Sequence, residues 1–271
     1  MIDPSPYRSI AVASTFSPRF EQVLAEAKRM RDRFASELSL IYVGEQSAEV
    51  AAKFRETLMR LDLPPDSAIH YEQGDPAEAI LRVLEQNAVE LIVAGALEKE
   101  VVLHPFLGNV ARRLLREGQS SIMLFTRPAR EPAPLRNIVF VAEYSDHGAQ
   151  SLRRTLHLAA AEKSERVFVV RLITTFDQAR AAREADAEAP AEDFDEEEKL
   201  EHFVLELGHT DVPVEVRCIR GNTGFAAADF VKSVDADLLV VPVDPQKNRG
   251  RLPTNLEWLV DVIPCNLWVV R

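Results

Sequence analysis

The sequence predicts an α/β protein with two doubly wound, Rossmann-like domains, each built on a five-stranded parallel sheet and packed together as a pseudo-dimer. Short apolar runs alternate with amphipathic segments, as in a parallel sheet covered by helices on both faces. The chain also repeats itself, and the repeated segments keep their order. The matching segments are 9–17 and 137–145, 74–80 and 221–227, and 90–95 and 237–242. Since the repeat divides the 271 residues near the middle, we predict domains at 1–129 and 135–271.

The apolar runs place the strands in order. In the first half we predict strands near 9–13, 38–43, 68–72, 91–94 and 121–125, and in the second near 137–142, 166–172, 214–219, 238–241 and 267–270. Residues 127–134 are rich in proline and predict a linker short enough to hold the halves together. The second half has an acidic insertion at about 176–200, read either as the solvated start of a helix or as a surface for a metal or a basic partner.

Composition narrows the function classes. The formal net charge is −11, with no basic stripe, which argues against nucleic acids as partners. No apolar run is long enough to span a bilayer and the first residues lack a signal peptide pattern, so we expect no membrane partner and a cytoplasmic location. The two cysteines, Cys218 and Cys265, have apolar neighbours and are interpreted as reduced core residues.

No motif predicts catalysis. The six histidines form no metal signature, and the chain has no Walker loop and no nucleophile paired with a base. We therefore predict a protein that is not an enzyme, with no catalytic or metal-binding residues. His104 falls in a loop near the expected ligand pocket, where it is either surface or a ligand contact. Arg112 and Arg113 either reach a phosphate or face solvent.

The paired segments 74–80 and 91–95, together with 107–111 before the last helix and strand of the first half, resemble a tandem universal stress protein over nearly the whole chain. The resemblance implies a role in the stress response. It also implies that the last strands of the halves, 122–125 and 267–270, pair with each other inside one chain. The expected partners are an unidentified protein and, through a homodimer, a second copy of the chain.

The resemblance also implies where a nucleotide would bind. ATP-binding members carry three glycines and a Ser or Thr in the loop after strand four, where the backbone approaches the phosphates. Gly95 and Gly108 correspond to the first and third glycines, and Asn109, a phosphate donor or helix cap, to the Ser or Thr. Thr15 occupies the place of an acidic residue after strand one, and Val43 ends strand two, where the family's backbone meets adenine. The implied cofactors are ATP, ADP or AMP in the first half.

The sequence departs from this pattern in both halves. Glu98 replaces the second glycine, which adds a Cβ atom and a negative charge near the phosphates. In the second half, Pro242 replaces the first glycine, while Glu143 keeps the acidic residue. We therefore expect a regulatory or interaction protein that binds adenine nucleotide at most weakly, in the first half. Two alternatives stay open: a nucleotide-dependent switch that binds and slowly hydrolyses ATP, and a partner-binding protein with both pockets closed.

Overall fold

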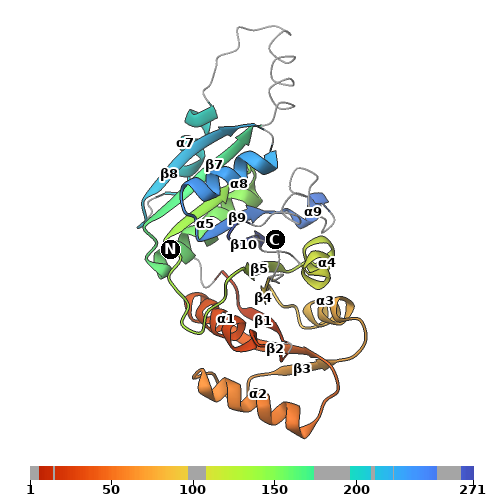
Figure 1. The fold of residues 1–271 in the computed structure, drawn as a ribbon. Helices are drawn as coiled ribbons and strands as arrows, with labels where there is room; N and C mark the ends of the chain where they lie inside the picture. Colours follow the sequence, from red (N-terminus) through yellow and green to blue (C-terminus); the bar gives the residue numbers. More distant parts are fainter. Residues whose placement is uncertain are drawn as a thin grey trace.

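The computed structural model describes residues 6–14, 16–96, 108–173, 196–208, 211–221, 223–248 and 264–271. Within these ranges ten strands form one continuous sheet in the order β3-β2-β1-β4-β5-β10-β9-β6-β7-β8. Neighbouring strands within each half are parallel, as predicted. Figure 1 shows the halves extending to either side of β5 and β10.

The first half supplies five strands and four described helices. The strands are β1 (Ser9–Ser14), β2 (Glu37–Val43), β3 (Ile69–Glu72), β4 (Leu91–Gly95) and β5 (Ser121–Phe125). The helices are α1 (Phe20–Phe34), α2 (Ala48–Arg60), α3 (Pro76–Gln86) and α4 (Asn109–Glu117). Local chemistry sets the start of α3, because Asp75 Oδ1 accepts from the Glu78 amide at 3.0 Å and Pro76 is the first helical residue.

The second half repeats this order of strands and helices. Its strands are β6 (Asn137–Val141), β7 (Arg166–Ile173), β8 (Val214–Arg220), β9 (Leu238–Pro242) and β10 (Asn266–Val270). Its described helices are α5 (Asp146–Glu162), α7 (Glu196–Leu205), α8 (Thr223–Ser233) and α9 (Pro245–Asn248). Every end of all ten strands lies within one residue of its prediction. Helix α7 begins with three glutamates, as expected for the end of the acidic insertion, whose residues 176–195 lie outside the described ranges.

Two hydrophobic layers cover the sheet, one on each face. Successive strand residues point to opposite faces, so that Val93 of β4 packs into one layer and Ile92 into the other. The first layer receives side chains from α1, α2, α5 and α7, and the second from α3, α4 and α8. This is the doubly wound arrangement that the alternating pattern predicted.

The two halves join through an antiparallel pair of strands. Leu124 pairs with Leu267, Met123 with Trp268 and Ile122 with Val269, which confirms the pairing expected for 122–125 and 267–270. The indole of Trp268 is fully buried at this seam, with its ring centroid 5.8 Å from that of Phe34. One sheet therefore runs through both halves, and its seam strands are both paired.

A buried ionic cluster ties α1 to α5 and to the linker. The Glu162 carboxylate accepts from Arg29 Nη1 at 3.2 Å, from Arg33 Nε at 2.6 Å and from the Leu135 amide at 3.1 Å. Its side chain has no exposed surface. Arg29 also pairs with Glu26 at 2.7 Å and donates to the Ala133 carbonyl. The short linker is thus held against both halves, in agreement with the prediction that they pack together.

The internal repeat extends to single hydrogen bonds. Ser36 Oγ donates to the Tyr7 carbonyl at 2.7 Å, and Ser164 Oγ donates to the Leu135 carbonyl at 2.5 Å. Each serine follows a helix C-cap in the left-handed conformation, Ala35 after α1 and Lys163 after α5. These features place α1 and α5 in register residue by residue.

Candidate functional site

The predicted ligand edge of the first half lies where β1 and β4 end. These two strands are neighbours although β2 and β3 separate them in sequence, so the strand order reverses between them, and ligands of such sheets bind at this point. Ser14 ends β1, Val43 ends β2 and Gly95 ends β4, all at the same edge. The structure places Val43 and Gly95 at this edge, on the two strands that flank β1, and their role as ligand contacts stays a prediction. Thr15, Glu98 and His104 lie outside the described residues.

Gly95 permits close packing of α1 against the end of β4. A Cβ atom at this position would lie 2.8 Å from Val23 Cγ2. Real Cβ contacts are essentially never this short, so any larger residue would displace α1 or Val23. The glycine therefore has a structural reason of its own, besides the phosphate contact that the resemblance implied.

Gly108 and Asn109 begin α4, which runs back from the ligand edge because it connects two parallel strands. Gly108 is the N-cap, and no side chain caps the helix. Asn109 is the first helical residue and is exposed. The expectation that Asn109 caps the helix is thus wrong, because the N-cap position belongs to its neighbour. The amide groups of the first turn of α4 could donate to an anion at this edge.

Arg113 is held by carboxylates on the surface formed by α3 and α4. Its guanidinium lies 2.8 Å from Asp75 Oδ1, 3.0 Å from Glu117 Oε1 and 3.5 Å from Glu78 Oε1. The hydrogen bonds to Glu117 raise the pKa of Arg113 further and lower that of Glu117. This arginine therefore makes ion pairs with its own surface, which agrees with the solvent-facing alternative.

The equivalent edge of the second half is crossed by an ion pair. Lys247 Nζ of α9 lies 3.1 Å from Oε1 of Glu143, which comes after β6. Asp244 Oδ1 accepts from the Gln246 amide at 2.8 Å, and this bond lowers the pKa of the Asp244 carboxyl. Pro242 is the last residue of β9 and is buried. At this edge Lys247 is already paired with Glu143, and Pro242 has no amide hydrogen to donate, so these residues do not reproduce the glycine loop of the ATP-binding pattern.

The sequence analysis missed Lys247 and the helix that carries it. The signal was Asp244 followed by Pro245, since aspartate at an N-cap and proline at the first helical position mark a helix start. Lys247 then falls three residues after Asp244, but only the fold brings it to Glu143.

Neither a metal centre nor a membrane span is found in the described ranges. No group of three or more histidine, cysteine, aspartate or glutamate side chains there is arranged to hold a metal ion. No helix in the same part of the chain has the length and apolar character needed to cross a membrane. Cys218 and Cys265 form no disulfide, and both residues are half-buried.

Comparison with known proteins identifies related sequences and folds. Residues 44–125 and 134–271 match the model of the universal stress protein family. No curated protein matches the sequence. A functionally unknown protein from Pseudomonas aeruginosa PAO1 has a similar structure, with a TM-score of 0.72 and 15% identity over 98% of this chain and 92% of that one.

Two further structures are similar over nearly their whole length. One is a universal stress protein from Archaeoglobus fulgidus DSM 4304, with a TM-score of 0.68 and 12% identity over 98% of this chain and 99% of that one. The other is the cytoplasmic domain of a prokaryotic cation chloride cotransporter, with a TM-score of 0.55 and 12% identity over 97% of this chain and 95% of that one. At these identities the likenesses show the fold alone.

Proposed function

The chain belongs to the universal stress protein family, and we propose that it is a stress-response regulatory protein of the cytoplasm that acts through contacts with other proteins and not as an enzyme. One observation carries the proposal. The ligand edge of the second half is crossed by the ion pair between Glu143 and Lys247, with Asp244 beside it. Because the ion pair occupies this edge and Pro242 supplies no amide donor, we propose that this half contributes surface and not a nucleotide site.

The first half is where an adenine nucleotide would bind, and we propose that ATP, ADP or AMP binds there weakly at most. The support is the edge formed by Val43 and Gly95, and the first turn of α4 after Gly108, which has no side-chain cap. Asn109 and Thr15 would complete this site. Glu98 opposes it, since a carboxylate stands there in place of the second glycine of the pattern.

Calorimetric titration tests the proposal. The native chain, Glu98→Gly and the matched control Glu100→Gly are titrated with ATP, ADP and AMP, with and without magnesium. The control removes a carboxylate two residues further along the sequence. We expect binding by the native chain to be no tighter than about 100 μM, a free energy near −5.5 kcal/mol. We expect Glu98→Gly, but not Glu100→Gly, to bind more tightly by about tenfold or more.

Release of inorganic phosphate from ATP is measured on the same samples. Tight binding together with steady release of phosphate by the native chain would refute the proposal and establish the second candidate, a switch that binds and slowly hydrolyses ATP. Equal binding by native protein and Glu98→Gly would refute the role given to Glu98.

A further inference from the structure

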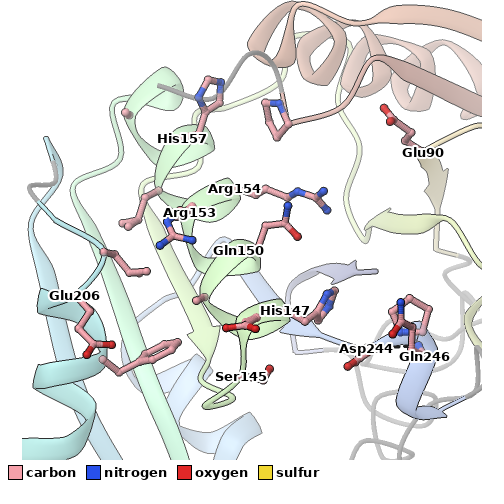
Figure 2. Close-up of a pocket in the computed structure, with 18 of the residues that line it drawn as sticks. Glu90, Ser145, His147, Gln150, Arg153, Arg154, His157, Glu206, Asp244 and Gln246 are labelled. Carbon is pink, nitrogen blue, oxygen red and sulfur yellow. Dashed lines mark hydrogen bonds between the residues drawn. The ribbon is translucent and has the colours of Figure 1, made fainter. Parts of the chain in front are cut away.

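The groove beside α5 selects no class of occupant. Its walls carry Arg153 and Arg154 together with Glu90, Glu206 and Asp244 (Figure 2), so charges of both signs face it. The free edges of the sheet are more selective, because a strand without a neighbour presents backbone N–H and C=O groups in a fixed order. Within the described residues these edges are β3 and β8, the first and last strands of the sheet order. Figure 1 shows them at opposite ends of the described chain.

The ladder between β2 and β3 shows which backbone groups of β3 face outward. The Gly44 amide, just after β2, donates to the Glu72 carbonyl at 2.8 Å. Alternate residues of a parallel strand bond to the same neighbour, so His70 and Glu72 bond to β2. The N–H and C=O groups of Ile69 and Tyr71 therefore point away from the sheet, and no described strand pairs with them.

The opposite edge, on β8, is shielded by one of its own side chains. The Pro213 carbonyl accepts from the Val167 amide at 2.9 Å, so the odd-numbered residues of β8 bond to β7 and Val216 faces outward. The Val216 carbonyl accepts from Nη1 of Arg217 at 2.9 Å. Charged side chains at an edge strand are one way in which natural sheets prevent pairing. In the described part of the chain, the outward groups of β3 have no such contact.

The side chains of β3 divide between the two faces of the sheet. His70 and Glu72 share the face of α3, where Arg82 Nη2 lies 2.6 Å from Glu72 Oε2. Tyr71 lies on the other face, with its ring centroid 6.1 Å from that of Tyr42. All four residues of β3 are half-buried, so each keeps exposed surface at this edge.

Two copies of the chain can pair these edges antiparallel about a twofold axis, whose position decides which side chains meet. With the axis at Tyr71, the two tyrosines exchange both backbone hydrogen bonds, and His70 of each copy lies opposite Glu72 of the other. An axis at His70 would oppose two histidines, and an axis at Glu72 two carboxylates. An axis at Ile69 would place Glu72 opposite Asp66. The Tyr71 register is thus favoured, since it twice sets an imidazole donor against a carboxylate acceptor.

We propose that the chain forms a homodimer through β3, in which the two β3 strands pair antiparallel about Tyr71. The ten-stranded sheet then continues into the second copy. The chain itself supplies a precedent, because β5 and β10 pair antiparallel and join two copies of one fold within a single chain. This inference goes beyond the proposed function, and neither depends on the other.

Sedimentation velocity of the full-length chain tests the dimer. Salt at about 0.15 M screens the repulsion between two copies that each carry a net charge of −11. We expect the native chain to dimerise with a dissociation constant of about 100 μM or less. Tyr71→Pro should stay monomeric up to about 1 mM, because proline removes the outward amide hydrogen but no bond to β2.

Two controls separate this amide from other effects of the substitution. Tyr71→Val keeps the amide and should still dimerise. Val216→Pro is the matched control, because it removes an outward amide from the other free edge, and it should dimerise like the native chain. Circular dichroism checks that each variant keeps its fold.

Opposite charge changes test the register. His70→Glu sets glutamate opposite Glu72, and Glu72→Lys removes both carboxylate acceptors, so each variant alone should dimerise about tenfold more weakly than the native chain. A mixture of the two restores opposite charges across both pairs. Labelled His70→Glu should therefore bind unlabelled Glu72→Lys at least about tenfold more tightly than it binds unlabelled His70→Glu.

A native chain that stays monomeric up to about 1 mM would overturn the inference. So would native-like dimerisation of Tyr71→Pro, or an equal loss in Val216→Pro. If Tyr71→Pro does not fold, the charge variants decide, and a mixture that associates no more tightly than His70→Glu alone rules out the proposed pairing. The nucleotide titrations are independent of these results, so failure of the dimer and failure of the proposed function are distinguishable.

Discussion

Replacing Glu162 with glutamine removes the carboxylate that joins the two halves. In the native chain this buried group accepts hydrogen bonds from Arg29, Arg33 and the Leu135 amide. Loss of one partner of a buried ion pair costs about 3–5 kcal/mol. Because Arg29 keeps Glu26 and glutamine keeps an oxygen that can accept from Leu135, we expect the lower end, about 3 kcal/mol of unfolding free energy.

Urea unfolding measures this loss. The signal is tryptophan fluorescence, to which Trp268, buried at the seam, contributes. With an m-value of about 3 kcal/mol/M, the unfolding midpoint should fall by about 1 M. Since one sheet and one linker couple the halves, we expect the native chain to unfold in one transition, which makes the midpoint meaningful.

Glu165→Gln is the control for this measurement. Glu165 follows α5 closely, but its side chain is 64% exposed and its ion pair with Arg136 is 3.5 Å long. Exposed pairs of this kind contribute about 0–1 kcal/mol, so its midpoint should change by less than about 0.3 M. If Glu162→Gln lowers the midpoint no more than Glu165→Gln does, the cluster does not hold the halves together and the reasoning is refuted.

Three further predictions follow from single sites. Gly95→Ala should destabilise the protein by about 1–3 kcal/mol, because the added methyl group meets Val23. Adding Val23→Ala to this variant should recover part of the loss. If the melting temperature of the double variant falls by the sum of the two single losses, the contact with Val23 is not the cause. Burial raises the pKa of the Cys265 thiol to about 12. In Cys218→Ala protein at pH 8, iodoacetamide should therefore alkylate Cys265 at least about a hundredfold more slowly in the folded state than in urea. Similar rates in the two states would show that the thiol is not protected by burial. Burial raises the pKa of Glu26 above its ordinary value of 4.5, so above that pH the native state binds more protons than the unfolded state. The free energy of unfolding of the native chain, relative to that of Glu26→Gln, should therefore fall as the pH rises from about 4.5. If urea unfolding shows this difference rising with pH, the predicted direction of the pKa shift is wrong.

The first half of the candidate site was predictable in part. The ends of β2 and β4 followed from the apolar runs, so the sequence alone placed Val43 and Gly95 at one edge of a parallel sheet. The reason for Gly95 was not predictable, because the side chain that excludes a Cβ atom belongs to α1, far away in sequence. Asn109 was misplaced by one position, since the chemistry of Gly and Asn allows either residue to cap a helix.

The second half shows a similar limit. Asp244 followed by Pro245 is a local signal for a helix start, but the sequence analysis did not use it. The pair of Lys247 with Glu143 crosses from the loop after β9 to the loop after β6, and only the adjacency of these strands brings the two side chains together.

The sequence by itself determined the elements of this protein, their order and their duplication, because the hydrophobic period of a segment depends only on neighbours along the chain. It also indicated, through the resemblance, that the last strands of the halves would pair. Tertiary structure alone decided that Glu162 is buried and that the linker covers one face of α1. The physical reason is that burial and pairing of charges depend on which distant surfaces meet, and equivalent helices of a repeat can meet different neighbours.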